Sequence, residues 1–424
     1  MKKIITVAAS AFLICNTLFS QTAGQKKILF DCTKAETSGN GDWVIDADLH
    51  DLNWSPGPVV GSGNTHSDPQ ILPTPSQTTI TSSTAETYWE GALSYWAIDC
   101  VNYGYWVETL PYNGHITYGS GTNAQDLSKF DIFVVDEPNI LFTAAEKTAM
   151  MNFINNGGSL FMISDHITSD RNNDGYDSPM IWKDFLTNNS VQNNAFGFAI
   201  EYQNFSDANY NSNVSTISND SITRGPYGNV SEVKWSNGTC FTMTPSQNSK
   251  VKGHVWKSGK GQTDTAVVCV TSQYGCGKVA AIGDSSPPDD GTGNPSASLY
   301  TGYTGDANGN HRPWLMNMMI WLAEAPNCTT TGIKSSVTEG NELSMYPNPA
   351  NDKVQVNFTN SSEKNAVLSL INMNGQVINA PQTHQKNNNQ DVFVVDTTPL
   401  AAGIYYCKAQ VDDKINIKKL VVIK

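Results

Sequence analysis

Residues 130–166 read FDIFVVDEPNILFTAAEKTAMMNFINNGGSLFMISDH, and this stretch decides the fold prediction. Two apolar runs, 130–136 and 159–164, have the length and composition of strands that are buried on both faces of a parallel sheet. Between them, Thr143-Ala-Ala-Glu146 is a capping box that predicts the start of a helix, and Asn156-Gly157-Gly158 predicts its end. A strand, a helix and a strand in this order predict a parallel unit of an α/β fold.

The same alternation extends in both directions from this stretch. Further strands are expected at 27–31, 105–110, 265–271 and 278–283, with one helix after a second capping box at Ser83–Glu86 and a last helix from Pro313. Residues 21–325 therefore form a predicted α/β domain with a doubly wound, mostly parallel sheet of the flavodoxin or amidotransferase kind. An Asn- and Ser-rich segment near 188–261 is predicted to be a β-rich insertion.

The chain changes character after residue 325. Residues 326–342 are rich in Thr, Ser and Gly and have no apolar periodicity, which is typical of a linker. Residues 343–424 contain short alternating apolar runs with turns between them. This pattern predicts a small C-terminal β-sandwich.

Charge and the N-terminus restrict the classes of function. The 424 residues carry a net charge of −13, and the last 84 residues hold eight lysines against seven acids, so the acidity lies in the middle of the chain. A field of this sign disfavours binding to nucleic acid. Residues 1–20, with Lys2-Lys3 before a short apolar run, predict a signal peptide, and no later run is long enough to predict a membrane span.

Four of the predicted strands are followed by acidic residues. Ligands of such sheets bind at the carboxyl ends of the strands, so these side chains should meet at one edge. The residues selected as a catalytic site are Glu137, Asp165, His166 and Asp284. Carboxylates beside an imidazole can hold a divalent cation or activate water, although a single Asp after a strand more often caps the next turn. Gly283-Asp284-Ser285 lacks the surrounding pattern of a serine esterase, so a serine nucleophile is not favoured.

The loop after 166 contains a possible cation motif. Asp170, Asn172 and Asp174, followed by Gly175, fit D-x-[DN]-x-[DN]-G, in which oxygen atoms face a hard cation. The twelfth position is not Glu, so Asp177 or another residue would complete the shell. Calcium is the expected ion, with another divalent metal as an alternative and a plain polar turn as the rival interpretation.

Disulfide bonds are expected in an exported chain. Seven cysteines follow the predicted signal peptide, and Cys407 is the only one in the C-terminal segment. If that segment is removed, six cysteines remain, a number that suits pairing in any of about 15 ways.

The C-terminal segment also resembles a known family. Met345 to Asp352, Met373 to Val377, Leu400 to Tyr405 and Lys418 to Lys424 resemble the ordered motifs of the type A sorting domain of the type IX secretion system. The resemblance implies export through the periplasm by the type IX machinery. It also implies a secreted or cell-surface location, after removal of this domain or anchoring through it.

The order of elements in residues 26–325 resembles the class I glutamine amidotransferase-like superfamily, including its trehalose-utilisation-type members. Active amidotransferases carry a cysteine nucleophile after a central strand, but the matching stretch here is Ile163-Ser-Asp-His166. The resemblance therefore implies the fold without glutaminase chemistry. Residues 36–43, 164–166, 170–179 and 283–293 also resemble an uncharacterised secreted family, which implies no activity.

These observations support two hypotheses of different classes. The first is an extracellular hydrolase acting on a polymer, with polysaccharide favoured, at the predicted acidic edge. The second is a non-catalytic, calcium-stabilised carbohydrate-binding module that stacks sugar rings on Trp54, Trp106 or Trp182.

Overall fold

The computed structural model describes residues 24–37, 43–46, 73–207, 213–292, 302–305, 309–324, 343–360, 362, 364–372, 376–411 and 414–424. The chain divides into two compact units, Met1–Cys328 and Thr329–Lys424, which are described separately below. The predicted signal peptide and linker lie outside the described residues. Among the described residues, no helix is both long and apolar enough to cross a membrane.

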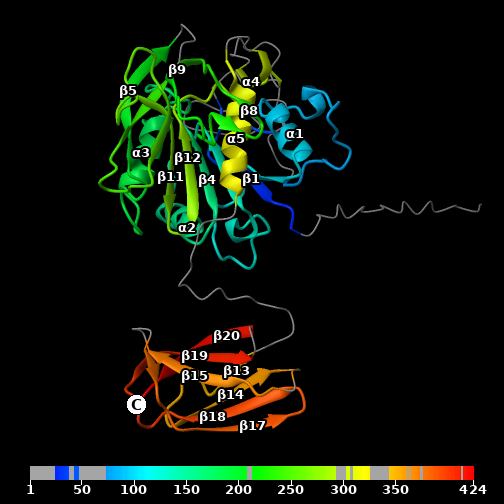
Figure 1. Cartoon of the computed structure of the whole chain (residues 1–424), viewed down its shortest axis with the longest axis vertical. Helices are drawn as coiled ribbons and strands as arrows, with labels where there is room; N and C mark the ends of the chain where they lie inside the picture. Colours follow the sequence, from blue (N-terminus) through cyan, green and yellow to red (C-terminus); the bar gives the residue numbers. More distant parts are fainter. Residues whose placement is uncertain are drawn as a thin grey trace, which may run out of the picture. The chain divides into compact units, whose positions relative to one another are not determined.

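The first unit is built on one mixed sheet, which has ten strands within the described residues (Figure 1). Five neighbouring strands run parallel, in the order β2 (Trp106–Leu110), β1 (Lys27–Asp31), β3 (Ile132–Asp136), β4 (Ser159–Ile163) and β12 (Gly277–Ile282). The residues of β3, β4 and β12 are all buried, which explains their continuous apolar sequences.

The other half of the sheet is antiparallel. These strands are β11 (Val267–Tyr274), β10 (Lys252–Trp256), β6 (Asn213–Val214), β9 (Trp235–Met243) and β5 (Phe198–Asp207). The predicted α/β class is confirmed, but the expectation of a mostly parallel sheet is wrong. The reason is that β11 follows β10 and precedes β12 through short connections, which can join only antiparallel neighbours. The doubly wound flavodoxin-like description stays an interpretation.

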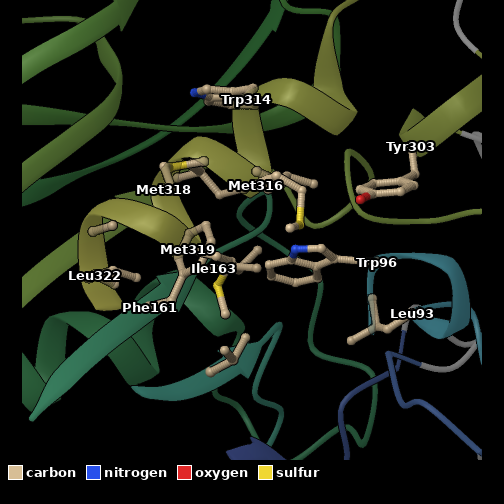
Figure 2. Close-up of a cluster of buried hydrophobic side chains, with 14 of the residues drawn as sticks. Leu93, Trp96, Phe161, Ile163, Tyr303, Trp314, Met316, Met318, Met319 and Leu322 are labelled. Atoms are coloured by element: carbon tan, nitrogen blue, oxygen red, sulfur yellow. The ribbon is translucent and has the colours of Figure 1, made fainter. Parts of the chain in front are cut away.

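Helices cover both faces of the sheet. Side chains of α1 (Ser94–Asn102) and α5 (His311–Ala323) share one apolar cluster with alternate residues of the strands. Side chains of α2 (Ala144–Asn155) and α3 (Ser178–Thr187) share the other. Figure 2 shows Trp96 of α1 among side chains of α5 and β4, and its ring meets Phe161 edge-on at 5.6 Å.

One of the two predicted capping boxes is present. Thr143 and Glu146 exchange both hydrogen bonds of the box at the start of α2, and the helix ends where Gly157 takes a positive φ of 108°. The box at Ser83–Glu86 does not start a long helix. It precedes only the short 3₁₀ turn η1 (Glu86–Tyr88), and α1 begins at Ser94.

A contact distant in sequence explains the late start of α1. The amide of Gly91 donates to the carbonyl of Ile45, and that of Leu93 donates to the carbonyl of Val44. A Cβ at Gly91 would lie 2.1 Å from the Val44 oxygen, so this segment follows the neighbouring chain instead of coiling.

The remaining described elements of this unit are short. They are η2 (Leu127–Lys129), β7 (Arg224–Gly225), β8 (Gly228–Asn229) and α4 (Gly302–Gly305).

The second unit contains two four-stranded antiparallel sheets. One has the order β13 (Leu343–Tyr346), β14 (Lys353–Thr359), β18 (Gln390–Asp396) and β17 (Gln382–Asn387). The other has the order β16 (Val377–Ile378), β15 (Val367–Asn372), β19 (Gly403–Val411) and β20 (Lys414–Val422). Alternate residues of β14 and β19 point into a shared core, as expected for a sandwich.

Candidate functional site

The predicted catalytic residues lie at the carboxyl ends of neighbouring parallel strands. Glu137 follows β3, Asp165 and His166 follow β4, and Asp284 follows β12. Because β3, β4 and β12 are adjacent, these loops share one edge of the sheet. We call the following residues the carboxyl-edge cluster: Asp136, Glu137, Asp165, His166, Arg171 and Asp284.

Glu137 is the most constrained member of the cluster. It is fully buried and has a positive φ of 41°, which is unusual for a residue other than glycine. Its Oε1 accepts from Arg171 Nε at 2.9 Å, and its Oε2 accepts from Trp43 Nε1 and Ser285 Oγ, both at 2.7 Å. Four separate segments of the chain therefore hold this carboxylate in place.

Arg171 connects Glu137 to Asp165. Its Nη2 donates to Asp165 Oδ2 at 3.0 Å, while its Nε binds Glu137. Burial alone would lower the pKa of Arg171, but the two carboxylates raise it. The guanidinium therefore stays charged and offsets part of the negative charge at this edge.

Asp165 has a strongly perturbed environment. It is 4% exposed, and burial together with the charges of Glu137 and Asp284 raises its pKa well above the usual value, although Arg171 opposes the shift. Asp284 is also buried, and its Oδ1 accepts from the amide of Ser286 at 2.9 Å. Asp165 can therefore keep a proton at a pH where an exposed aspartate has lost it.

His166 is the member that meets solvent, with 22% of its side chain exposed. Its Nδ1 lies 2.7 Å from the carbonyl oxygen of Ile167. Because a carbonyl can only accept, Nδ1 carries a hydrogen, and Nε2 of the neutral ring has a free lone pair. Nε2 lies 3.5 Å from both Asp165 Oδ2 and Arg171 Nη2.

Asp136 also belongs to the cluster, although the sequence pattern favoured its neighbour Glu137. It is 2% exposed, and neither carboxyl oxygen has a hydrogen-bond partner. Burial, followed by the charges of Glu137, Asp165 and Asp284, raises its pKa well above the usual value. An unpartnered buried carboxyl group is costly, and such groups concentrate at functional sites.

Sequence reasoning also missed Arg171 as a site residue, and Trp43 and Ser285 as partners of Glu137. Arg171 occupies a variable position of the predicted cation motif, so the motif gave no reason to select it. Trp43 and Ser285 lie in two stretches that resemble the uncharacterised secreted family, and this was the only signal for them.

A second pair of acids lies after β1. Asp31 is buried with no partner for Oδ2, and burial raises its pKa to about 6 despite the nearby charge of Lys34. The two carboxyl oxygens of Glu36 accept from the amide of Lys34, and burial and the charge of Asp31 raise the pKa of Glu36 as well. The electrostatic influence of Glu36 extends to Asp136.

The predicted calcium ligands bind mainly protein donors in this structure. Asp170 accepts from the amides of Asp174 and Gly175, and Asp174 accepts from Asn172 Nδ2. Asp177 caps α3 through the amide of Met180. Within the described part of the chain, no group of three or more His, Cys, Asp or Glu side chains is placed to hold a metal ion. The calcium site stays a prediction.

The tryptophans suggested as sugar platforms are not available for stacking. Trp182 is fully buried and its Nε1 donates to the carbonyl of Ile163, and Trp106 is only 8% exposed. This part of the prediction is wrong because both side chains pack against the sheet. Trp54 lies outside the described residues.

The cysteines also differ from the expectation of a paired set. Cys276 is disulfide-bonded, but Cys32, Cys100, Cys240 and Cys269 are buried thiols, as is Cys407. Cys100 and Cys269 lie in the same apolar cluster as Trp314 and behave as small core residues.

Comparison with known proteins identifies the C-terminal segment. Residues 344–424 match the family described as the secretion system C-terminal sorting domain. No curated protein matches the chain. The prediction of a type IX sorting domain is confirmed, and the protein is secreted or held at the cell surface.

Solved structures add only distant similarities. The chain is 10% identical to the mmIFT52 N-terminal domain, with a TM-score of 0.40 over 70% of this chain and 97% of that one. Two complexes of titin M10 with the obscurin-like 1 Ig domain are each 15% identical, with TM-scores of 0.15. The complex of a point mutant covers 19% of this chain and 92% of that chain, and the complex in space group P1 covers 20% and 93%. These similarities carry no argument about function, and none of them supports the amidotransferase-like resemblance.

Proposed function

We propose that the protein is an extracellular hydrolase that uses the carboxyl-edge cluster on a polymer, with polysaccharide favoured. The observation that carries the proposal is the pair formed by Asp165, a carboxyl group with a raised pKa, and His166, a partly exposed imidazole 3.5 Å away. Perturbed groups of this kind at a ligand-binding edge are candidates for acid and base catalysis.

The two groups have complementary abilities. A protonated Asp165 can donate to the leaving oxygen of a glycosidic bond, as raised-pKa carboxyl groups do in glycoside hydrolysis. The free lone pair of His166 Nε2 can accept a proton from water. Arg171, which contacts both Glu137 and Asp165, keeps the edge from carrying several uncompensated charges as protons move.

Secretion supports the choice of a polymer. A protein delivered outside the cell by its sorting domain meets substrates that are too large to be imported intact. The preference for polysaccharide rests on the proton-donating carboxyl group, because a glycosidic oxygen is a poor leaving group unless it is protonated.

An activity screen tests the proposal. The secreted protein is incubated with polysaccharides, ester substrates and peptide substrates, and product release is compared with that of the His166→Ala variant. We expect polysaccharide cleavage that His166→Ala lowers by about 10² or more. If every substrate class remains intact, or His166→Ala cleaves as fast as the parent protein, the proposal is wrong.

A further inference from the structure

A second concave site lies away from the carboxyl-edge cluster. A pocket of about 660 Å³ is lined by residues of β10, β11, the end of α5 and the loop at 217–221. This volume is typical of small-molecule binding sites. Gln273, which lines the pocket, pairs with Lys278 near the start of β12, whereas Asp284 follows the end of that strand. The two sites therefore lie at opposite ends of β12.

The floor of the pocket is a buried hydrogen-bonded chain. His254 Nδ1 lies 2.9 Å from both carboxyl oxygens of Asp220, and its Nε2 lies 2.7 Å from Thr271 Oγ1. The register between β10 and β11 shifts between Gly253 and Val255, so His254 sits at a bulge. Bulges redirect side chains and occur often beside functional sites.

The chain of bonds determines what Thr271 offers to a ligand. Burial would raise the pKa of Asp220, but its bonds to His254 and to backbone amides lower it to about 2, so it is ionised and accepts from Nδ1. In the neutral imidazole, Nε2 then has a lone pair and receives the hydroxyl hydrogen of Thr271. The remaining lone pairs of Thr271 Oγ1, which lines the pocket, can accept from a ligand hydroxyl.

The walls and the rim have a different character. Trp256 and Trp321 both line the pocket, and the Trp321 ring is fixed by Lys278, whose Nζ lies 4.7 Å from the ring centre and donates to the Trp321 carbonyl. Lys250 and Lys252, both exposed, line the pocket as well. Two ammonium groups at one mouth are notable in a chain whose net charge is −13.

We propose that this pocket binds an acidic sugar, a hexuronate unit of a polysaccharide. Such a unit has an apolar ring face for the tryptophans, hydroxyl groups that donate to Thr271, and a carboxylate for Lys250 or Lys252. A neutral sugar would leave the two lysines unused, and a flat aromatic anion would leave the Thr271 acceptor unused. The inference deepens the proposed function, since it names the class of polysaccharide, but the binding event requires no member of the carboxyl-edge cluster.

Calorimetric titration of the full secreted chain tests the assignment. The probes are digalacturonate and the matching neutral disaccharide, 4-linked galactobiose, each at low and high salt. We expect digalacturonate to bind with a Kd of about 1 mM or lower, at least about tenfold more tightly than galactobiose, and more weakly at high salt.

Variants locate the binding. Lys250→Gln with Lys252→Gln should weaken digalacturonate binding about tenfold, and Thr271→Val should do the same, whereas Lys183→Gln on α3 is the control for loss of a positive charge elsewhere and should have no effect. Both pocket lysines are exposed, so the double variant should keep its melting temperature. Equal binding of the two disaccharides, no binding by the intact chain, or unchanged binding by the double lysine variant would overturn the assignment.

The control His166→Ala separates this site from the proposed hydrolysis. It should bind digalacturonate normally even where cleavage is lost. Binding without any cleavage would leave the pocket assignment intact and contradict the proposed function, and cleavage without binding would do the reverse.

Discussion

At the scale of single residues, the carboxyl groups of the carboxyl-edge cluster differ in their partners. Glu137 has three hydrogen-bond donors and lies against the Arg171 guanidinium, whereas Asp136, the residue before it, has no partner for either oxygen. Neighbours in the sequence thus meet opposite environments, because successive residues at the end of a strand point to different sides. This contrast leads to separate predictions for catalysis and for stability.

Asp165→Asn should abolish activity while leaving the fold intact. The change keeps the size of the side chain and an oxygen that Arg171 can bind, but it removes the transferable proton. We expect kcat on the cleaved substrate to fall by about 10² to 10⁴, with the melting temperature nearly unchanged. Asp184→Asn, a partly exposed carboxylate that pairs with Lys147 on the surface of α3, is the matched control and should retain full activity. Full activity in Asp165→Asn, or its unfolding, would make Asp165 a structural residue.

Asp136→Asn tests the cost of the unpartnered carboxyl group. Its pKa is raised from 3.8 in the folded protein, so above pH 4 the folded state holds a proton that the unfolded chain has released. Stability from this group therefore falls as pH rises towards the folded-state pKa, by about 1.4 kcal/mol for each pKa unit. The melting temperature of the parent protein should fall between pH 5 and pH 8, and that of Asp136→Asn should fall less.

Asp126 provides a control of opposite sign. Burial raises its pKa, but bonds from Ser128, Thr117 and backbone amides lower it to about 2. Its stabilisation is therefore present above pH 4 and lost as pH falls towards 2. Asp126→Asn should lower the melting temperature at pH 7 and have little effect near pH 2. Parallel pH profiles for the parent protein and Asp136→Asn would show that the Asp136 carboxyl group does not titrate as described.

At the scale of elements, local and distant interactions explain what the sequence could predict. The start of α2 was predictable because Thr143 and Glu146 are three residues apart and bond to each other's backbone. The start of α1 was not, because the carbonyls of Val44 and Ile45 determine it from more than 40 residues away. The antiparallel half of the sheet was missed for a related reason: an apolar run shows burial but not the direction of its neighbour.

The same distinction applies to the candidate site. Acids directly after β3, β4 and β12 were visible as a pattern, and the parallel order of these strands brings them to one edge. Arg171 reaches that edge across a loop, and the His254 chain joins three distant segments, so neither left a periodic or motif signal.

The loop at 170–177 leads to a prediction about calcium. Asp170 and Asp174 bind backbone amides in the structure, and a cation would compete for the same oxygens. If the loop binds calcium, the ion should stabilise the fold by about 2.7 kcal/mol at a hundredfold excess over Kd, visible as a rise in melting temperature. The measurement is the difference between melting curves with calcium and with chelator.

Variants of the loop must be compared through this difference. Asp170→Ala removes bonds to Asp174 and Gly175, so it should lower the melting temperature by itself. The calcium-dependent rise should vanish in Asp170→Ala and Asp174→Ala and persist in Asp184→Asn. Identical curves with calcium and chelator in the parent protein would leave a polar turn as the correct interpretation.

At the scale of the whole molecule, the two units have separate cores. The two large clusters of the first unit contain only residues between Ile28 and Ala323, and the cluster of the second contains only residues from Leu343 onward. Each sheet is likewise completed by strands of its own unit. The buried apolar surface that stabilises the first unit is therefore supplied by that unit itself.

Deletion of residues 343–424 should block export without unfolding the rest. The sorting domain matches 344–424, and its removal takes away no described residue of the two clusters that stabilise the first unit. We expect the truncated protein to accumulate in the periplasm with a cooperative melting transition, while the full chain reaches the medium or the cell surface. Cell fractionation with an antibody against the first unit measures the distribution. A deletion in the first unit, residues 217–221 at the sugar pocket, is the control and should leave export intact. Normal secretion of the truncated protein would show that residues 343–424 are not the export signal.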